Sequence, residues 1–172
     1  MQLTDSRDIM ASPEVVWAAI LNPEVLKDCV PGCESMSGSA ESGFEAVVVQ
    51  KVGPVSARFT GLVKLSDLEP LKGLKISGEG KGGPAGYAKG GATVTMEAIE
   101  GGTRLNYAVE ANVGGKIAQL GSRIIDSFAK KMADSFFERF QTAVEGPKEE
   151  AAAEADAEAD GKKKGWFKRL IG

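Results

Sequence analysis

The sequence predicts an α+β protein: a curved antiparallel β-sheet of about seven strands, two short helices, and one long C-terminal helix over a cavity. Three observations favour this class of fold. Two proline-initiated helix starts occur near the N-terminus, a long region of period-two alternation follows, and an apolar stripe with helical spacing closes the region. With 172 residues and 42% apolar content, the chain is expected to form one domain followed by a tail.

The N-terminal elements are defined mainly by their start signals. Residues 2–10 look extended and predict a first strand. Ser12 and Pro13 then form a helix start, and Asn22 and Pro23 repeat the same signal. Two brief helices in tandem are therefore expected, and the second should end at Pro31 and Gly32.

Period-two alternation runs from about residue 33 to residue 113. The run from Val55 to Leu65 alternates apolar or small residues with mostly polar ones, and the run from Leu105 to Val113 does the same. Gly- and Pro-containing turns separate the runs, including Gly53-Pro54 and Gly101-Gly102. This pattern predicts a meander of about six antiparallel strands after the two helices.

A single long helix is expected from Lys116 to about Val144. Apolar residues recur there at three- and four-residue spacing, among them Ile117, Phe128 and Phe140. The stripe advances mostly by four, so it drifts around the helix axis and suits a helix lying across a twisted sheet. A strand, two helices, six strands and a closing helix make a helix-grip arrangement.

Small residues in the strands predict unfilled space beneath the long helix. Gly61, Gly78, Gly80, Ala88 and the pair Gly90-Gly91 lie within or beside the strands. The alternative is that the glycines form bulges around a packed core. If a cavity exists, alternation and helical phase predict ten residues that line it and bind the ligand: Phe59, Val63, Tyr87, Met96, Tyr107, Val109, Leu120, Ile124, Phe128 and Met132.

The residues give little sign of catalysis. Histidine is absent, which removes the commonest general base and the usual catalytic zinc ligands. Cys29 and Cys33 are the only cysteines, too few for a structural zinc site; small buried residues at a turn are the default interpretation, and a regulatory disulfide is the alternative. No catalytic or metal-ligating residues are predicted, and a net charge of −3 argues against nucleic-acid binding.

The C-terminal region is strongly charge-segregated. Residues 146–160 carry six acids and one base and predict a disordered acidic linker, whereas residues 161–172 carry five bases and no acid. As a helix, the last segment would place its apolar and basic residues on opposite faces, which is typical of binding to an anionic membrane. The alternatives are a solvated tail or a helix that docks on a protein. The predicted membrane-binding residues are Lys162, Lys163, Lys164, Trp166, Phe167, Lys168, Arg169, Leu170 and Ile171.

Several motifs in residues 1–145 resemble those of the CoxG family, the G subunits of carbon monoxide dehydrogenase. They include Val30-Pro-Gly-Cys-Glu34, Val52-Gly-Pro-Val55, Phe59-Thr-Gly61 and Gly121-Ser-Arg-Ile-Ile-Asp126. That family is part of the START-like, or SRPBCC, superfamily. The resemblance implies a deep hydrophobic pocket between sheet and helix. It also implies an accessory protein, not an enzyme, that brings a molybdenum hydroxylase such as CO dehydrogenase to the cytoplasmic membrane.

The combined expectation is a carrier and adaptor. It would bind a lipid-like ligand such as an isoprenoid quinone, menaquinone or ubiquinone, with no tightly bound cofactor. It would be cytoplasmic and peripherally associated with the inner face of the cell membrane. One alternative is a pure membrane-recruitment tether with a filled interior. A cyclase- or dehydratase-type enzyme of the kind known in the superfamily is the least favoured alternative.

Overall fold

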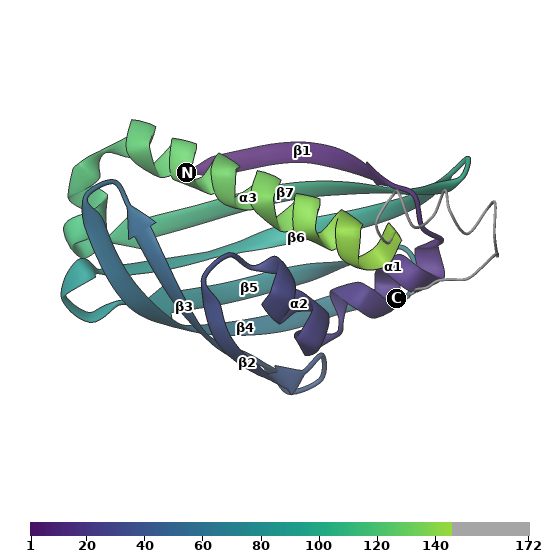
Figure 1. The fold of residues 1–172 in the computed structure, drawn as a ribbon, viewed down its shortest axis with the longest axis horizontal. Helices are drawn as coiled ribbons and strands as arrows, with labels where there is room; N and C mark the ends of the chain where they lie inside the picture. Colours follow the sequence, from purple (N-terminus) through teal and green to yellow (C-terminus); the bar gives the residue numbers. More distant parts are fainter. Residues whose placement is uncertain (146–172) are drawn as a thin grey trace, which may run out of the picture.

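The computed structural model describes residues 1–145, which form one curved sheet with helices along its open side. The order is β1 (Gln2–Ile9), α1 (Pro13–Ile20), α2 (Pro23–Cys29), β2 (Cys33–Ser39), β3 (Gly43–Val52), β4 (Val55–Glu69), β5 (Gly73–Lys81), the 3₁₀ turn η1 (Gly83–Ala85), β6 (Tyr87–Ile99), β7 (Gly102–Gly114), the 3₁₀ segment η2 (Gly115–Leu120) and α3 (Ser122–Glu145). The predicted class of fold is confirmed (Figure 1).

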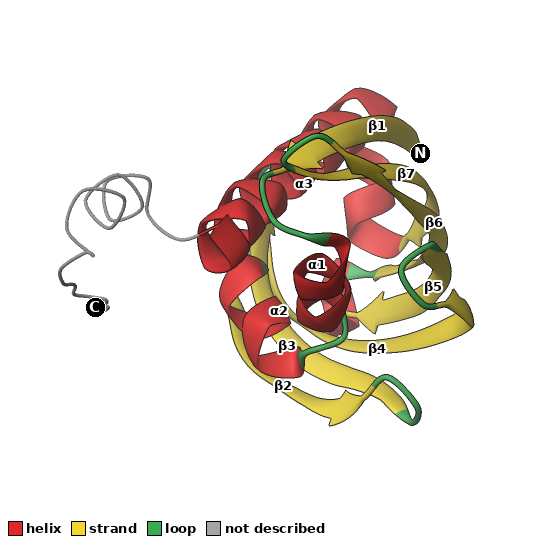
Figure 2. Ribbon diagram, turned by 90° about the vertical axis from the view of Figure 1, so that its right-hand side faces the viewer, coloured by secondary structure: helices red, strands yellow, loops and turns green. Residues whose placement is uncertain are grey.

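All seven strands belong to one antiparallel sheet in the order β1-β7-β6-β5-β4-β3-β2. Every neighbouring pair except β1 and β7 is consecutive in the chain, as expected of a meander. The sheet curls around the helices. The view along the molecule shows α1 inside the curve of the sheet and α3 along its open side (Figure 2). The curved sheet and α3 therefore enclose an interior.

The two short helices begin where their caps predict. The Ser12 hydroxyl accepts a hydrogen bond from the Val15 amide, and the Asn22 side chain accepts one from the Glu24 amide at 2.9 Å. These bonds satisfy amides that have no partner within the first helical turn, and Pro13 and Pro23 each occupy the first helical position. Each helix is therefore started by its own sequence.

Alternation sets which strand residues face the interior. Along β4, residues from Val55 to Leu65 alternate between half-buried and exposed positions, as the period-two pattern predicts. Cross-strand pairs carry the inner face from one strand to the next, for example Val63 opposite Phe44 on β3.

The expectation of one continuous helix from Lys116 is wrong. The chain forms η2 first, and Gly121 separates η2 from α3 with a φ of 93°. Residues with side chains rarely adopt that backbone conformation, so glycine favours a break at this point. The long helix therefore begins at Ser122.

The most deeply buried cluster lies where α1, α2 and the C-terminal half of α3 meet the sheet. Its members are Ile9, Val16, Ala19, Cys29, Met96, Leu105 and Phe140. Cys29 and Cys33 are both free thiols, and burial is the main cause that raises the pKa of each. Within residues 1–145, no helix is both long and apolar enough to cross a bilayer.

Candidate functional site: an apolar cavity under the long helix

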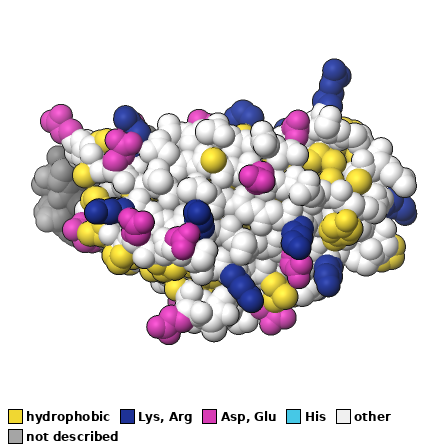
Figure 3. Space-filling model, turned by 180° about the vertical axis from the view of Figure 1, so that it is seen from behind, with side chains coloured by type: hydrophobic (Ala, Val, Ile, Leu, Met, Phe, Trp, Pro, Cys, Tyr) yellow, Lys and Arg dark blue, Asp and Glu magenta, His cyan; other side chains and the backbone are white. Residues whose placement is uncertain are grey.

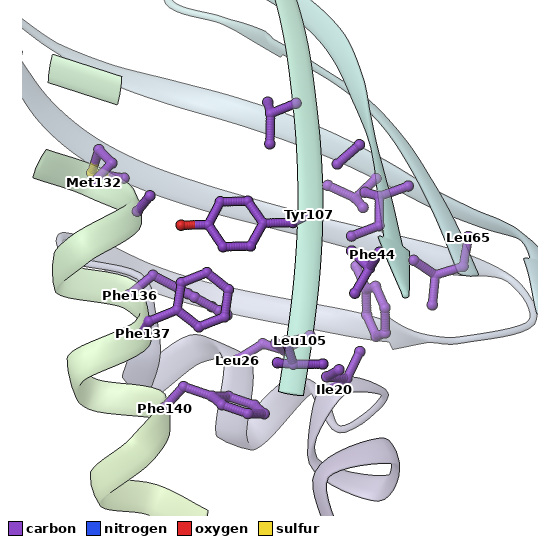
Figure 4. A pocket seen from close by; sticks show the side chains of 16 residues that line it. Ile20, Leu26, Phe44, Leu65, Leu105, Tyr107, Met132, Phe136, Phe137 and Phe140 are labelled. Atoms are coloured by element: carbon purple, nitrogen blue, oxygen red, sulfur yellow. The ribbon is translucent and has the colours of Figure 1, made fainter. Parts of the chain in front are cut away.

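A cavity of about 330 Å³ lies between the inner face of the sheet and the C-terminal half of α3 (Figure 4). The short helices α1 and α2 border the cavity at one end. Its surface is entirely apolar, and sixteen side chains contribute to it: Ile20, Leu26, Phe44, Val63, Leu65, Ile76, Ala92, Val94, Leu105, Tyr107, Val109, Met132, Ala133, Phe136, Phe137 and Phe140.

Strand alternation explains the sheet side of the cavity. Ala92 and Val94 lie two residues apart on β6, and Tyr107 and Val109 lie two residues apart on β7. Side chains two apart on a strand share a face, and the antiparallel register brings Val94 opposite Tyr107. The cavity floor is therefore continuous from strand to strand.

The helix side of the cavity is mainly aromatic. Phe136 and Phe140 are four residues apart on α3, so they share one face, and their rings stack with centroids 5.8 Å apart. The Phe137 ring meets Phe136 edge-on at 5.1 Å and stacks on Tyr107 at 4.8 Å. These aromatic contacts join α3 to β7 across one wall of the cavity.

A small polar cluster lies beside that wall. Arg7 of β1 forms an ion pair with Asp134 of α3, and its guanidinium carbon lies 5.4 Å from the centre of the Phe137 ring. Lys130 also pairs with Asp134, at 3.2 Å. The hydrogen bond from Lys130 is the largest cause that lowers the pKa of Asp134, and Arg7 adds to it. Asp134 is therefore ionised at neutral pH and links β1 to α3.

Tyr107 connects the polar cluster to the cavity. Burial raises the pKa of its hydroxyl, and the positive charge and hydrogen bonding of Arg7 oppose that rise. No second titratable side chain lines the cavity. The sixteen lining side chains therefore include no pair of a general acid and a general base. Within residues 1–145, no group of three or more His, Cys, Asp or Glu residues could hold a metal ion.

The chain matches the CoxG family, described as the G subunit of carbon monoxide dehydrogenase, over residues 6–145. The match covers most of the chain. This protein belongs to the CoxG family. No curated protein sequence matches the chain significantly.

Solved structures place this CoxG-family chain among START-like, SRPBCC proteins. A conserved protein from Geobacillus kaustophilus is 26% identical, with a TM-score of 0.78 over 84% of this chain and 95% of that one. A protein from Rhizobium leguminosarum is 15% identical, with a TM-score of 0.67 over 86% and 95% of the two chains. A protein from Thermus thermophilus is 18% identical, with a TM-score of 0.62 over 84% and 97%. The last two likenesses concern the fold alone.

The structure brings four of the ten sequence-predicted ligand residues to the cavity of this CoxG-family protein. These are Val63, Tyr107, Val109 and Met132. Six others do not line it: Phe59, Tyr87, Met96, Leu120, Ile124 and Phe128. Most of these six lie toward the η2 end of the molecule, where α3 begins.

Local packing explains where several of the six lie instead. The Phe59 ring covers Gly82, and the Tyr87 ring covers Gly114 while remaining 50% exposed. Met96 belongs to the buried core, and Ile124 is 38% exposed on α3. Helical phase and strand parity predict which side chains face the interior. They do not predict at which end of the sheet the cavity lies.

Sequence reasoning missed the contributions of the short helices and of the end of α3. Ile20 of α1 and Leu26 of α2 line the cavity, and Phe136, Phe137 and Phe140 form its aromatic wall. Phe136 and Phe140 were visible in the apolar stripe as residues four apart. Nothing in the local sequence shows that α1 and α2 lie at one end of the space beneath α3.

A cavity exists in the CoxG-family structure, but the glycines that suggested one do not line it. Gly61 pairs with Gly80, and Gly78 pairs with Gly90, so they gather in a neighbouring part of the sheet. Gly90 has a packing reason to be glycine, because a Cβ there would lie 2.2 Å from the Glu110 carbonyl oxygen. The nine predicted membrane-binding residues, Lys162 to Lys164 and Trp166 to Ile171, lie outside the described residues.

Proposed function

We propose that this protein is an accessory carrier and adaptor. It binds a hydrophobic, lipid-like ligand in the cavity under α3, with an isoprenoid quinone as the leading candidate. It also links a molybdenum-containing CO dehydrogenase-type enzyme to the cytoplasmic face of the membrane. Membership of the CoxG family supports the accessory role, and the apolar cavity is the observation that carries the ligand-binding role.

The cavity lining favours an uncharged, apolar ligand. A buried charge needs a partner, and the sixteen lining side chains offer none that is charged. The volume of about 330 Å³ is near the lower end of the range of roughly 300–1,000 Å³ for ligand pockets. A ring system with a short stretch of its chain suits this volume, and the remainder of a long isoprenoid tail would extend outside.

The position of Glu145 supports a connection between cavity and membrane. The Glu145 carboxylate accepts a hydrogen bond from the Met10 amide at 2.7 Å, so the described chain ends beside the loop that leads into α1. Ile20, at the end of α1, lines the cavity. The last described residue therefore lies at the same end of the molecule as the proposed ligand site (Figure 1).

A pure recruitment tether is the second candidate. Like the carrier, a tether would use the basic segment, residues 161–172, and would bind the client enzyme. Unlike the carrier, it would not require a ligand in the cavity. The open volume beneath α3 favours the carrier. The enzyme alternative has less support, because Tyr107 is the only titratable side chain in the lining.

Ligand binding is tested with the full chain and quinone-containing vesicles. The protein is incubated with vesicles with and without menaquinone, reisolated and analysed by native mass spectrometry. Ala92→Phe and Ala133→Phe introduce rings into the cavity from its two walls, whereas Ala108→Phe makes the same change at an exposed position on β7. We expect quinone on the wild type and Ala108→Phe, and little on the two cavity-filling variants.

The outcomes separate the carrier from the tether. Circular dichroism first shows which of the four proteins are folded. If the folded wild type carries no quinone, and no folded variant carries any, the carrier role is wrong and the tether remains. Equal loading of all four proteins would show that quinone binds elsewhere.

Membrane binding is tested by deleting residues 161–172 from the full chain. We expect the wild type to float with anionic vesicles and the deletion variant not to, while both bind neutral vesicles weakly. The charge contribution should fall as salt is raised, because surface electrostatics are screened. Retained flotation of the deletion variant on anionic vesicles would show that the basic segment is not the membrane-binding element.

A further inference from the structure

The two ends of the described domain differ in charge. Ten acids and five bases lie in the segments at the end where α3 finishes (Figure 1), which are residues 8–28, 67–75, 97–104 and 138–145. Six bases and two acids lie in the segments at the opposite end, where α3 starts, which are residues 51–58, 79–89 and 112–126. The first end therefore attracts cationic groups, and the second attracts anionic ones.

Exposed apolar side chains lie at the acidic end, around the start of α1. Met10 is 50% exposed and Val15 is 47% exposed. Ala18, which is three residues after Val15 on the same helix, is exposed as well, and so is the acidic residue Glu14. The solvent-facing side of α1 thus combines apolar side chains with a carboxylate.

Contacts of Met10 bring two more carboxylates to this region. The Met10 amide donates to the Glu145 carboxylate at 2.7 Å. A Cβ at Gly101 would lie 3.9 Å from the Met10 sulfur, so the turn that carries Glu100 lies against Met10. No ion pair within residues 1–145 involves Glu14, Glu100 or Glu145. We call the whole set the α1 surface: Met10, Glu14, Val15, Ala18, Glu100 and Glu145.

The basic segment, residues 161–172, has the complementary chemistry. It carries five bases and no acid, and its four large apolar side chains are Trp166, Phe167, Leu170 and Ile171. Its cations complement the carboxylates of the α1 surface, and its apolar side chains would cover Met10 and Val15. The opposite end of the domain, with its excess of bases, would repel the same segment.

The length of the intervening chain brings the segment to this end. Glu145 is the last described residue and already lies at the α1 surface. Residues 146–160 separate it from the basic segment, and a fully flexible chain of that length spans roughly 20 Å. Such a tether gives a local concentration on the order of millimolar, so even a weak contact is formed. The length of β4, Val55–Glu69, places the opposite end roughly 45 Å away.

We propose that the basic segment docks on the α1 surface of its own chain, and that an anionic membrane competes for the segment. Docking covers the apolar side chains of the segment in solution. At an anionic bilayer the cations interact with lipid phosphates instead, and the segment leaves the α1 surface. The competition rests on the proposed membrane role of the segment, whereas the docking itself requires no membrane.

The consequence is that membrane attachment is conditional. The internal contact lowers the apparent affinity of the segment for a bilayer by the fraction of molecules in which the segment is free. Neutral or weakly charged surfaces therefore fail to release it, and strongly anionic surfaces succeed. A change that weakens the α1 surface should strengthen membrane binding.

Docking is tested through the fluorescence of Trp166 in the full chain. Trp17 is the only other tryptophan, so Trp17→Phe leaves Trp166 as the sole reporter. In this background we expect Trp166 to emit at shorter wavelength, and to be quenched less by acrylamide, than in a peptide of residues 161–172. Raised salt should move both readouts toward the peptide values, because exposed charge pairs are screened.

A pair of substitutions identifies the surface. Val15→Lys with Glu100→Lys should also move Trp166 toward the peptide values, because it adds cations to the α1 surface. Val49→Lys with Glu45→Lys is the matched control, since it makes the same change of charge at exposed positions on β3. The control pair should leave Trp166 unchanged. Circular dichroism establishes that each protein is folded.

The competition is tested with phosphatidylcholine vesicles that contain phosphatidylserine. We expect the chain with Val15→Lys and Glu100→Lys to bind them roughly three- to tenfold more tightly than the control pair, because two contacts that hold the segment are lost. The matched net charge removes the general effect of added lysines. Deletion of residues 161–172 should abolish the difference between the two pairs.

The outcomes distinguish docking from the membrane role. Identical Trp166 readouts in the full chain and the peptide would overturn the proposal, and so would equal release by the two lysine pairs. An emission that depends on protein concentration would show that a second copy holds the segment, and would overturn docking within one chain. If Trp166 is docked and released as expected but the full chain does not bind anionic vesicles, docking stands and the proposed membrane role fails.

Discussion

The two ends of α3 do different things although both carry an apolar stripe. The C-terminal part, residues 132–145, contributes Phe136, Phe137 and Phe140 to the core and to the cavity wall. The N-terminal part, residues 122–131, follows the break at Gly121 and leaves Ile124 38% exposed. One helix thus provides a firmly packed end beside the cavity and a more exposed end near η2.

Polar contacts reinforce the difference between the two ends. Asp134 pairs with Arg7, the Gln141 side chain donates to the Asp8 carbonyl at 2.9 Å, and Glu145 accepts from the Met10 amide. All three contacts join the C-terminal part of α3 to β1 or to the residue after it. The cavity is therefore bordered by the better anchored end of the helix.

The surface seen from behind the sheet carries mixed charges and scattered apolar side chains (Figure 3).

The largest expected effect comes from truncating an aromatic side chain at the packed end. Phe140→Ala should lower the free energy of unfolding by about 3–5 kcal/mol, because Phe140 is completely buried and stacks on Phe136. Ile124→Ala should cost about 1 kcal/mol or less at the exposed end. Urea denaturation of both variants measures the difference. Equal losses would show that the two ends of α3 are packed alike.

A smaller effect is expected from two glycines on neighbouring strands. Gly90→Ala should destabilise the fold by about 1–3 kcal/mol, because its Cβ would meet the backbone of Glu110. Gly80→Ala should stabilise the fold by about 0.4–1 kcal/mol, because the nearest atom to its Cβ is 3.9 Å away and the unfolded chain loses freedom. Thermal unfolding should move the two midpoints in opposite directions. A rise in both midpoints would mean that the sheet relaxes around the new side chain at Gly90.

The smallest effect concerns the acid sensitivity of the anchored end. The folded-state pKa of Asp134 lies below its ordinary value because of Lys130 first and Arg7 second. Its stabilising contribution is therefore present above the unfolded pKa of about 3.9 and is lost as pH falls through the lower folded value. Asp134→Asn should flatten the fall in melting temperature between neutral pH and about pH 3. Asp8 pairs with Arg104 on β7 and has a lowered pKa for the same kind of reason, so Asp8→Asn is the matched comparison away from the cavity.

The sequence predicted the elements well where a local signal defines them. Ser12 with Pro13 and Asn22 with Pro23 are capping signals that act within one helical turn, and both helices begin there. Strand parity identified the inward faces of β4 and β7, so it placed Val63, Tyr107 and Val109 on the side of the sheet that lines the cavity. The prediction failed at Gly121, where a backbone conformation available to glycine ended η2 and shifted the start of the long helix.

What the sequence by itself determined is the alternation, the caps and the helical stripe, because each depends on neighbours a few residues away. The position of the cavity was decided only by the tertiary structure. Ile20 and Leu26 come from helices at one end of the curved sheet, and they meet the last turns of α3 more than a hundred residues later in the chain. The volume between them depends on how far the sheet curls and on which turns of the helix meet it. No local pattern of residues encodes that distance.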